Sequence, residues 1–301
     1  MGLCDTVRTY CQELLEDAQH VSIDAEAVAV YGVGSGAGAP APALDPLTSF
    51  VEGSPAALSQ HLLILDTINF GSGWAPTLRK RRDPATGRTV SAARTTAWNL
   101  ADHARAEGPW DGAALRAMRT ETVAAVLGQP ADHELMSLYA QALRELGRFL
   151  GDRTATDLVA AAGGSAERFA ELLAAGMTLF CDQGFFKRAQ IAAADQAIGG
   201  CARFTDLARL TAFADNLVPH VLRCDGLIAY DDGLASTIDD ERLLAPGRAE
   251  REIRAAAVVV CDMLARRLGT SATAIDMALW NRGQEPVYKA RPRHRTRSVY
   301  Y

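Results

Sequence analysis

The chain has 301 residues, of which 49% are hydrophobic and 22% are charged. This is the balance of an ordinary globular protein, which excludes a largely disordered chain. The formal net charge of −5 argues against a protein that coats nucleic acid, and no apolar run approaches the roughly 20 residues of a membrane span. No segment separates the chain as a linker would. The sequence therefore predicts a single domain over residues 1–301, built from one or two lobes.

The beginning of the chain lacks the long apolar core of a secretory signal. The cysteines form no C-x-x-C pair and have no zinc-ligand spacing, so we expect reduced thiols, no metal site and a cytoplasmic protein. They are Cys4, Cys11, Cys181, Cys201, Cys224 and Cys261. Residues 32–43 are rich in Gly, Ala and Pro, which predicts a flexible loop. The glycines of this loop do not have the order of a dinucleotide-binding or Walker phosphate loop.

Helical periodicity predominates in the rest of the chain. In residues 133–151, apolar side chains recur at three- and four-residue steps, which predicts a helix with one buried stripe. Similar stripes predict helices at residues 6–18, 113–127, 166–180, 187–198, 249–268 and 273–280. Residues 61–69 are apolar and partly β-branched, so we expect a strand that forms a small hairpin with the Arg-rich turn at 80–91. The predicted fold class is mainly α with a small β ribbon.

Four blocks of sequence place a charged residue inside an apolar or aromatic frame. They are LILDTINFGSGW around Asp66, GFFKRAQIAAAD around Lys187, LTAFADNLVPHVL around Asp215 and DMALWN from Asp276. Burying a charge is costly unless the charge is paired or used. The blocks therefore indicate a pocket rather than a solvated surface.

Two of these blocks leave two interpretations open. Lys187 either snorkels along the protein surface with its ammonium group in water, or it holds an anionic group. Asp215 either caps a helix, which is the commonest role of such a residue, or it faces a flat ligand together with Phe213, two residues earlier. Both residues are candidates for a ligand site under the second interpretation.

The late helix carries a further group of candidates. Asp276 and Trp280 share one side of this helix, and the amide of Asn281 lies at its margin. The charged block at residues 250–254, EREIR, has the spacing of surface salt bridges, which is the interpretation that we prefer. We therefore expect the first group in a pocket and the second on the surface.

The tail at residues 289–301 is strongly basic and contains no acidic residue. Its cations are Lys289, Arg291, Arg293, Arg295 and Arg297. Such a tail is either a solvated tether or an anion clamp. Composition favours the tether, because terminal basic runs are commonly disordered. The aromatic ending Tyr300-Tyr301 favours the clamp, because a mobile tether gains nothing from two large rings.

Six ordered blocks together resemble a known family. These blocks are LDTINFGSGW, FFKRAQIAAAD, LTAFADNLVPHVL, EREIRAAA, DMALWN and HRTRSVYY, and the similarity spans residues 45–301. They resemble the queuosine salvage proteins, the queuosine 5'-phosphate N-glycosylase/hydrolases. The resemblance implies a helical fold related to DNA glycosylases and release of the base queuine from queuosine 5'-monophosphate, with no metal or organic cofactor. The implied partner is a small nucleotide or nucleobase, with no nucleic acid and no membrane.

The resemblance also assigns residues to roles. Phe213 and Asp215 match the family's base-binding Phe-x-Asp, in which a carboxylate accepts hydrogen bonds from two N–H groups of a guanine-like edge and a ring stacks on its face. The implied catalytic residues are Lys187, Asp276 and Asn281. The other implied substrate-binding residues are Asp45, Asp66, Asn69, Met277, Trp280, Arg188 and Arg295. Lys187 and some of the tail arginines would neutralise a phosphate.

Three positions depart from the family pattern. Asn281 stands where the family has an Asp that acts as nucleophile or stabilises the transition state, Met277 stands where it has a Tyr, and residues 43–47 lack its ligand-contacting His. A carboxylate stabilises an oxocarbenium-like cation better than a neutral amide does. The implied function is hydrolysis of the N-glycosidic bond of queuosine 5'-monophosphate or a related 7-deazapurine or purine nucleotide. The alternatives are an enzyme for another nucleoside-like substrate in secondary metabolism and a non-catalytic binding protein.

Overall fold

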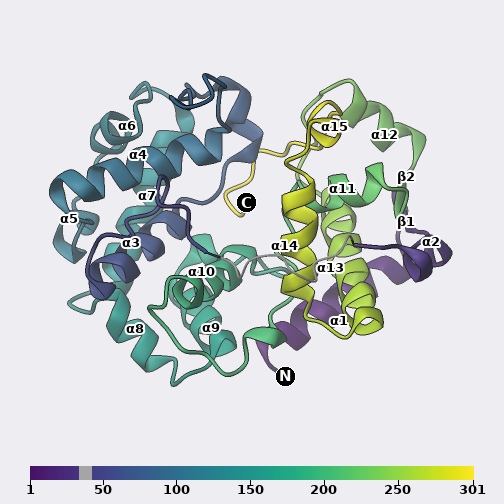
Figure 1. Cartoon of the computed structure of the whole chain (residues 1–301), viewed down its shortest axis with the longest axis horizontal. Coiled ribbons are helices and arrows are strands. Elements are labelled where there is room, and N and C mark those ends of the chain that lie inside the picture. Colours follow the sequence, from purple (N-terminus) through teal and green to yellow (C-terminus); the bar gives the residue numbers. More distant parts are fainter. Residues whose placement is uncertain (34–42) are drawn as a thin grey trace.

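The computed structural model describes residues 1–33 and 43–301, so the predicted flexible loop at 32–43 lies almost wholly outside the described residues. The chain folds into two lobes of helices, and the last residues of the chain run between them (Figure 1). The prediction of a mainly helical protein is confirmed. The relation to DNA glycosylases stays a prediction.

The first lobe packs around one apolar core, to which Leu143 and Phe169 contribute fully buried side chains. Its helices are α3 (Pro55–Thr67), α4 (Ala92–Glu107), α5 (Gly112–Arg116), α6 (Thr120–Leu127), α7 (Glu134–Leu150), α8 (Ala155–Ala161), α9 (Ala166–Gly176) and α10 (Lys187–Ile198), with the short turns η1 (Ser72–Thr77) and η2 (Thr178–Phe180). The amphipathic stripe of α7 faces this core, as its periodicity predicts.

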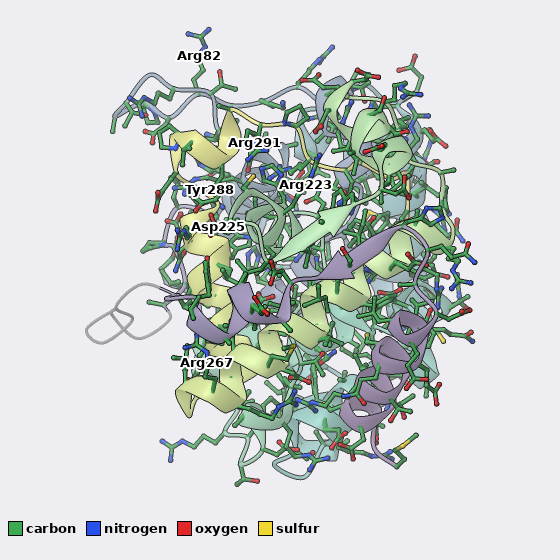
Figure 2. All side chains as sticks on the ribbon, turned by 90° about the vertical axis from the view of Figure 1, so that its right-hand side faces the viewer. Arg82, Arg223, Asp225, Arg267, Tyr288 and Arg291 are labelled. Carbon is green, nitrogen blue, oxygen red and sulfur yellow. The ribbon has the colours of Figure 1, made fainter. Side chains whose placement is uncertain are left out.

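The second lobe has a smaller core of its own. Its elements are β1 (Val21–Ile23), α2 (Ala25–Val30), η3 (Leu207–Arg209), α11 (Val218–Cys224), β2 (Ile228–Tyr230), α12 (Asp232–Asp239), α13 (Arg248–Leu268), α14 (Ala272–Arg282) and α15 (Pro286–Lys289). Asp225 ties several of these elements together, because it accepts hydrogen bonds from the hydroxyls of Tyr31 and Tyr288. Figure 2 shows Asp225 and Tyr288 on the outer side of this lobe.

Two helices join the lobes. Helix α13 places Ala255 and Val258 in the first core and Ile253 and Val260 in the second. Helix α1 (Leu3–Glu16) packs against both α9 and α13. Helix α13 therefore contributes a different face to each core, and the two lobes cannot separate without exposing apolar surface.

The predicted strand at residues 61–69 is wrong, because this segment is the second half of α3 and the turn after it. Ser54 caps the helix by accepting from the amide of Ala57, and Pro55 occupies the first helical position. The segment is buried on nearly all sides, so its apolar run has no visible helical period. The predicted turn at 80–91 contributes only a single antiparallel bridge, between Arg82 and Thr89.

The β ribbon forms from segments that are far apart in the sequence. Strand β1 pairs antiparallel with β2, and Ser22 lies opposite Ala229. Such a non-local pair of three-residue strands leaves no hairpin signal for a sequence pattern to detect.

The predicted helices are largely confirmed, and those at residues 113–127 and 166–180 are interrupted. Helix α10 begins and ends where the pattern at 187–198 predicts. The segment 113–127 is broken into α5 and α6, because Arg119 is extended. A side chain at Gly147 of α7 would lie 2.5 Å from the backbone nitrogen of Arg116, so this glycine permits α5 to pack closely on α7.

Candidate functional site

The four charged blocks meet where the two lobes face each other. Asp66 lies in the last turn of α3, Lys187 begins α10, Asp215 precedes α11, and Asp276 lies in α14. Burial raises the pKa values of Asp66 and Asp276, the positive charge of Lys187 partly opposes that rise, and the charge of Asp215 acts on Lys187. The structure therefore brings together one lysine and three carboxyl groups from four segments that are distant in the sequence.

Asp276 is a buried carboxyl group that is anchored to the segment before α11. Its side chain is 5% exposed, and its Oδ1 accepts a hydrogen bond of 2.9 Å from the amide of Phe213. Burial raises the pKa of Asp276 to about 8, with a further contribution from the negative charge of Asp215. Asp276 is therefore largely protonated at neutral pH.

Asp215 fixes the turn before α11 and also remains open to the site. Its Oδ1 accepts from the amides of Leu217 at 2.7 Å and Val218 at 3.3 Å. The N-cap of α11 is Leu217 and no side chain caps it, so the capping interpretation is wrong in detail. The residue stays partly exposed, and its charge interacts with Lys187 and Arg293. Contact with a flat ligand stays a prediction, and the turn leaves the second carboxylate oxygen available for it.

Lys187 does not lie on the protein surface. Its side chain is 5% exposed, and its Nζ donates to the carbonyl oxygen of Asn69 at 3.4 Å, so the snorkelling interpretation is wrong. Burial lowers the pKa of Lys187, and the carboxylate of Asp215 is the largest opposing influence. Phe186, which precedes it, has a left-handed φ of 50°, a backbone conformation that is uncommon outside glycine and often found at functional sites.

Asp66 lies deeper than the other carboxyl groups. It is 1% exposed, and neither carboxyl oxygen has a geometric hydrogen-bond partner within the described residues, although Asn69 lies beside it. Burial raises its pKa well above the usual range, and the negative charge of Asp195 raises it further. Asp195 of α10 has its own pKa raised by burial to about 6. The sequence analysis missed Asp195, although it ends the block that contains Lys187.

Arg188 is fully buried, and its guanidinium group binds the protein itself. It donates to the carbonyl oxygens of Thr67, Leu179 and Val299 and lies 4.7 Å from the ring centres of both Phe70 and Phe180. These contacts join α3, η2 and the tail. We therefore interpret Arg188 as a residue that positions the site rather than one that binds a substrate.

Two predicted substrate-binding residues lie among other partners. Asp45 forms an ion pair of 2.8 Å with Arg94 at the start of α4 and accepts from the amide of Leu47. Arg295 donates to the carbonyl oxygen of Glu241 in the second lobe. The structure does not join either of them to the cluster around Lys187, and their role in binding stays a prediction.

The other predicted residues of α14 lie closer to solvent than Asp276. Trp280 is 42% exposed, Asn281 is exposed, and Met277 is partly buried. One helix therefore presents a buried acid and, a turn later, an open indole and amide. Their contact with a substrate stays a prediction.

The tail is packed between the lobes, so the solvated-tether interpretation is wrong. His294, Thr296 and Tyr301 are buried, and the amide of Gly71 donates to the carbonyl oxygen of Tyr301 at 2.9 Å. Burial lowers the pKa of His294 to about 3, with help from the charges of Arg254 and Arg293, so this imidazole is neutral. The tail runs between the two lobes that carry the two halves of the site (Figure 1).

The tail arginines face different surroundings. Arg297 lies 3.4 Å from Glu134, and Arg291 lies with Arg223 near Asp239 on the outer side of the second lobe (Figure 2). Arg293 instead interacts with Asp215. Its side chain is exposed, and its pKa is lowered by desolvation.

The prediction of surface salt bridges for the EREIR block is wrong. Glu250, Glu252 and Arg254 are all buried. Glu252 accepts from the backbone amides of Gln19 and His20 and pairs with Arg248 at 2.7 Å. Buried and exposed charges at helical spacing have the same sequence pattern, so spacing could not separate them.

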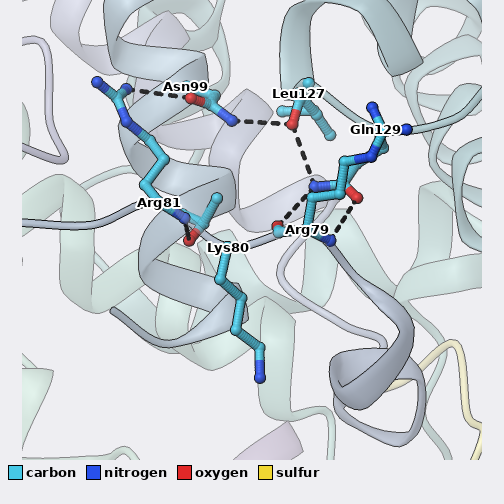
Figure 3. Close-up of a pocket in the computed structure, with 8 residues that line it drawn as sticks. Arg79, Lys80, Arg81, Asn99, Leu127 and Gln129 are labelled. Atoms are coloured by element: carbon cyan, nitrogen blue, oxygen red, sulfur yellow. Dashed lines mark hydrogen bonds between the residues drawn. The ribbon is translucent and has the colours of Figure 1, made fainter. Parts of the chain in front are cut away.

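A cavity of about 260 Å³ lies elsewhere, in the first lobe, and none of the predicted site residues lines it (Figure 3). Its polar groups largely bind one another. Gln129 accepts from the amide of Arg79 at 2.9 Å, and Arg81 binds Asn99 and Asp102 while lying 3.7 Å from the ring centre of Trp98. We interpret this cavity as part of the scaffold rather than as the functional site.

The described residues contain neither a cluster of metal-ligating side chains nor a helix that could cross a membrane. In residues 1–33 and 43–301, no group of three or more His, Cys, Asp or Glu side chains is placed to hold a metal ion. None of the described helices combines the length and apolar character that a membrane crossing requires. All six cysteines are free thiols, three of them buried and three partly buried.

Fold and site define a class: a helical protein with a buried lysine and several carboxyl groups at the junction of two lobes. The chain belongs to the queuosine salvage protein family, whose sequence profile matches residues 51–301. It is 30% identical to the queuosine 5'-phosphate N-glycosylase/hydrolase of Sphaerobacter thermophilus, over 98% of this chain and 97% of that protein. Proteins of the same name from Mus musculus (28% identity, 56% of this chain and 58% of that protein) and Dictyostelium discoideum (34%, 39% and 40%) are also similar.

Proposed function

We propose that this protein is an N-glycosidase that hydrolyses queuosine 5'-phosphate and releases its base. The proposal is supported by family membership and by a relative of this name that aligns over nearly the whole chain. The observation that carries it is the hydrogen bond from Phe213 to Asp276, which puts a protonated carboxyl group beside the Phe213–Asp215 segment.

In this proposal the Phe213–Asp215 segment grips the base. The ring of Phe213 is partly buried and stacks on a planar heterocycle, while Asp215 accepts hydrogen bonds from its guanine-like edge. Lys187 interacts with Asp215 and supplies a positive charge beside the bound ligand. Arg293, whose charge interacts with Asp215, binds the phosphate.

Asp276 supplies the proton for the departing base. As the bond between the base and C1' breaks, the base leaves with the bonding electrons and takes a proton from Asp276. C1' takes the hydroxyl group of a water molecule, and the other proton of that water returns to the carboxylate. A carboxyl group with a pKa near 8 holds a proton at neutral pH and can release it to a stronger base. The carboxylate that remains stabilises the positive charge that develops on the ribose.

The test is release of base from queuosine 5'-phosphate by wild type, Asn281→Asp and the matched control Asn281→Ala. We expect release by wild type and faster release by Asn281→Asp, because a carboxylate at this exposed position adds negative charge at the mouth of the site. Release by Asn281→Asp alone would favour a non-catalytic binding protein. No release by any variant would favour a different nucleoside-like substrate in secondary metabolism.

We further propose a cytoplasmic protein with a small-molecule ligand. The free thiols support a reducing compartment, since cysteines of secreted proteins commonly pair. The negative net charge supports a small ligand rather than a nucleic acid.

A further inference from the structure

Two segments of the sequence have no role in the proposed reaction, the EREIR block and the end of the tail. They meet inside the protein, because Arg254 of the first contacts Tyr301 of the second. We propose that Arg254 and Tyr301 are positioning residues that hold the Phe213–Asp215 segment in the shape that binds the base. This inference rests on the proposed function.

Arg254 holds the segment directly through its backbone. The guanidinium group is 2% exposed, and its Nε donates to the carbonyl oxygen of Ala214 at 2.9 Å. Its two terminal nitrogens bind the two carboxylate oxygens of Asp182, and Glu250 lies 3.5 Å away. A guanidinium group that forms this bidentate pair has a fixed plane, so the direction of its Nε hydrogen bond is fixed as well.

Two aromatic rings pack against the guanidinium group of Arg254. The ring centre of Tyr301 lies 4.6 Å from the central carbon of Arg254, and that of Phe185 lies 3.9 Å from it. Cation–π contacts of this kind strengthen when water is excluded, as it is here. Tyr301 therefore stabilises the orientation of Arg254 through its ring, and its buried hydroxyl has no geometric hydrogen-bond partner within the described residues.

The tail in turn is fixed to the first lobe. Gly71 donates to the carbonyl oxygen of Tyr301, and Arg188 donates to that of Val299 at 2.8 Å. At Gly73 an added side chain would lie 2.5 Å from the carbonyl oxygen of Thr296, so the tail runs directly over this glycine. The first lobe therefore fixes the position of Tyr301, whose ring packs against Arg254 of α13.

The segment that these contacts hold is neither helix nor strand, so it depends on side chains for its shape. Three successive residues are fixed: the amide of Phe213 by Asp276, the carbonyl of Ala214 by Arg254, and the side chain of Asp215 by the start of α11. Losing the middle contact frees Phe213 and Asp215 to turn independently. The predicted consequence is weaker binding of the base, with the phosphate half of the substrate unaffected.

The test measures binding of each half of the substrate separately by calorimetry, with queuine and ribose 5-phosphate as the probes. For Tyr301→Ala we expect the Kd for queuine to rise about tenfold, the size of one desolvated cation–π contact, and the Kd for ribose 5-phosphate to stay unchanged. Tyr301→Phe keeps the ring and restores queuine affinity. The matched control is Tyr300→Ala, which removes the neighbouring ring and leaves both affinities unchanged.

Tyr301→Leu serves as a second variant, because it fills most of the space without providing a π face and so avoids a large cavity. A selective loss of queuine affinity in Tyr301→Leu or Tyr301→Ala supports the inference. Equal losses for both probes, or wild-type affinity for queuine, would overturn it. If wild type bound neither probe, the proposed function itself would fail, which is a separate and recognisable result.

Discussion

Asp66 on the α3 side of the site and Asp276 on the α14 side are both buried carboxyl groups, yet their surroundings differ. Asp276 accepts a backbone hydrogen bond and lies near Asp215, and burial raises its pKa to about 8. Asp66 has no geometric hydrogen-bond partner in the described part of the chain and lies near Asp195, and burial raises its pKa well above the usual range. Burial alone therefore does not make a proton donor: a usable acid needs a donor that partly stabilises its ionised form.

The largest expected effect is on kcat, which should distinguish Asp276 from Asp66. Asp276→Asn removes the proposed proton donor while keeping the shape of the side chain, so kcat should fall about a hundredfold or more. Asp66→Asn replaces one neutral group with another and should keep kcat within about threefold of wild type. Initial rates of base release at pH 7 measure both. Equal losses in the two variants would contradict the distinction.

The next effect is on stability as a function of pH. The folded pKa of Asp276, about 8, lies above that of an unfolded aspartate, so the folded state keeps a proton that the unfolded chain releases. Its contribution is fully present below about pH 4 and is lost as pH rises toward 8, by at most about 1.4 kcal/mol per pH unit.

Urea unfolding of wild type and Asp276→Asn at pH 5 and pH 8 measures this contribution. We expect the free energy of unfolding to fall less steeply with pH in Asp276→Asn, which has no proton to lose there. Parallel slopes for the two proteins would show that Asp276 does not titrate in this range.

The smallest effect is expected from Asp66→Asn on stability at neutral pH. Because burial keeps Asp66 protonated, the substitution exchanges one neutral polar group for another, and the free energy of unfolding should change by about 1 kcal/mol or less. A loss of several kcal/mol in thermal or urea unfolding would mean that Asp66 is ionised and paired with Lys187.

Local sequence patterns predicted the elements whose signals are local. Helix α10 shows its stripe and its start at Lys187, and the local hydrogen bond of Asp215 before α11 follows from the residues around it. The segment 61–69 was predicted wrongly, because a helix buried on nearly every side loses its period. The two β strands lie far apart in the chain, so their pairing was invisible.

The candidate site was predictable as a set of residues and not as a geometry. Asp66, Lys187, Asp215 and Asp276 stood out because charge inside an apolar frame needs a reason. Asp195 was missed because two turns of helix separate it from Lys187. Arg254 was assigned to the surface, since only the packing of α13 between two cores reveals that its charge is buried.

The absence of a side chain at Gly73 affects residues that are distant in the sequence. The tail passes so near this residue that any β-carbon would meet the backbone of Thr296, and the displaced tail would carry the ring of Tyr301 away from Arg254. A substitution at the edge of the first lobe would then loosen a loop that belongs to the second. Position 73 therefore accommodates only glycine because the tail, which is distant from it in the sequence, packs directly against its backbone.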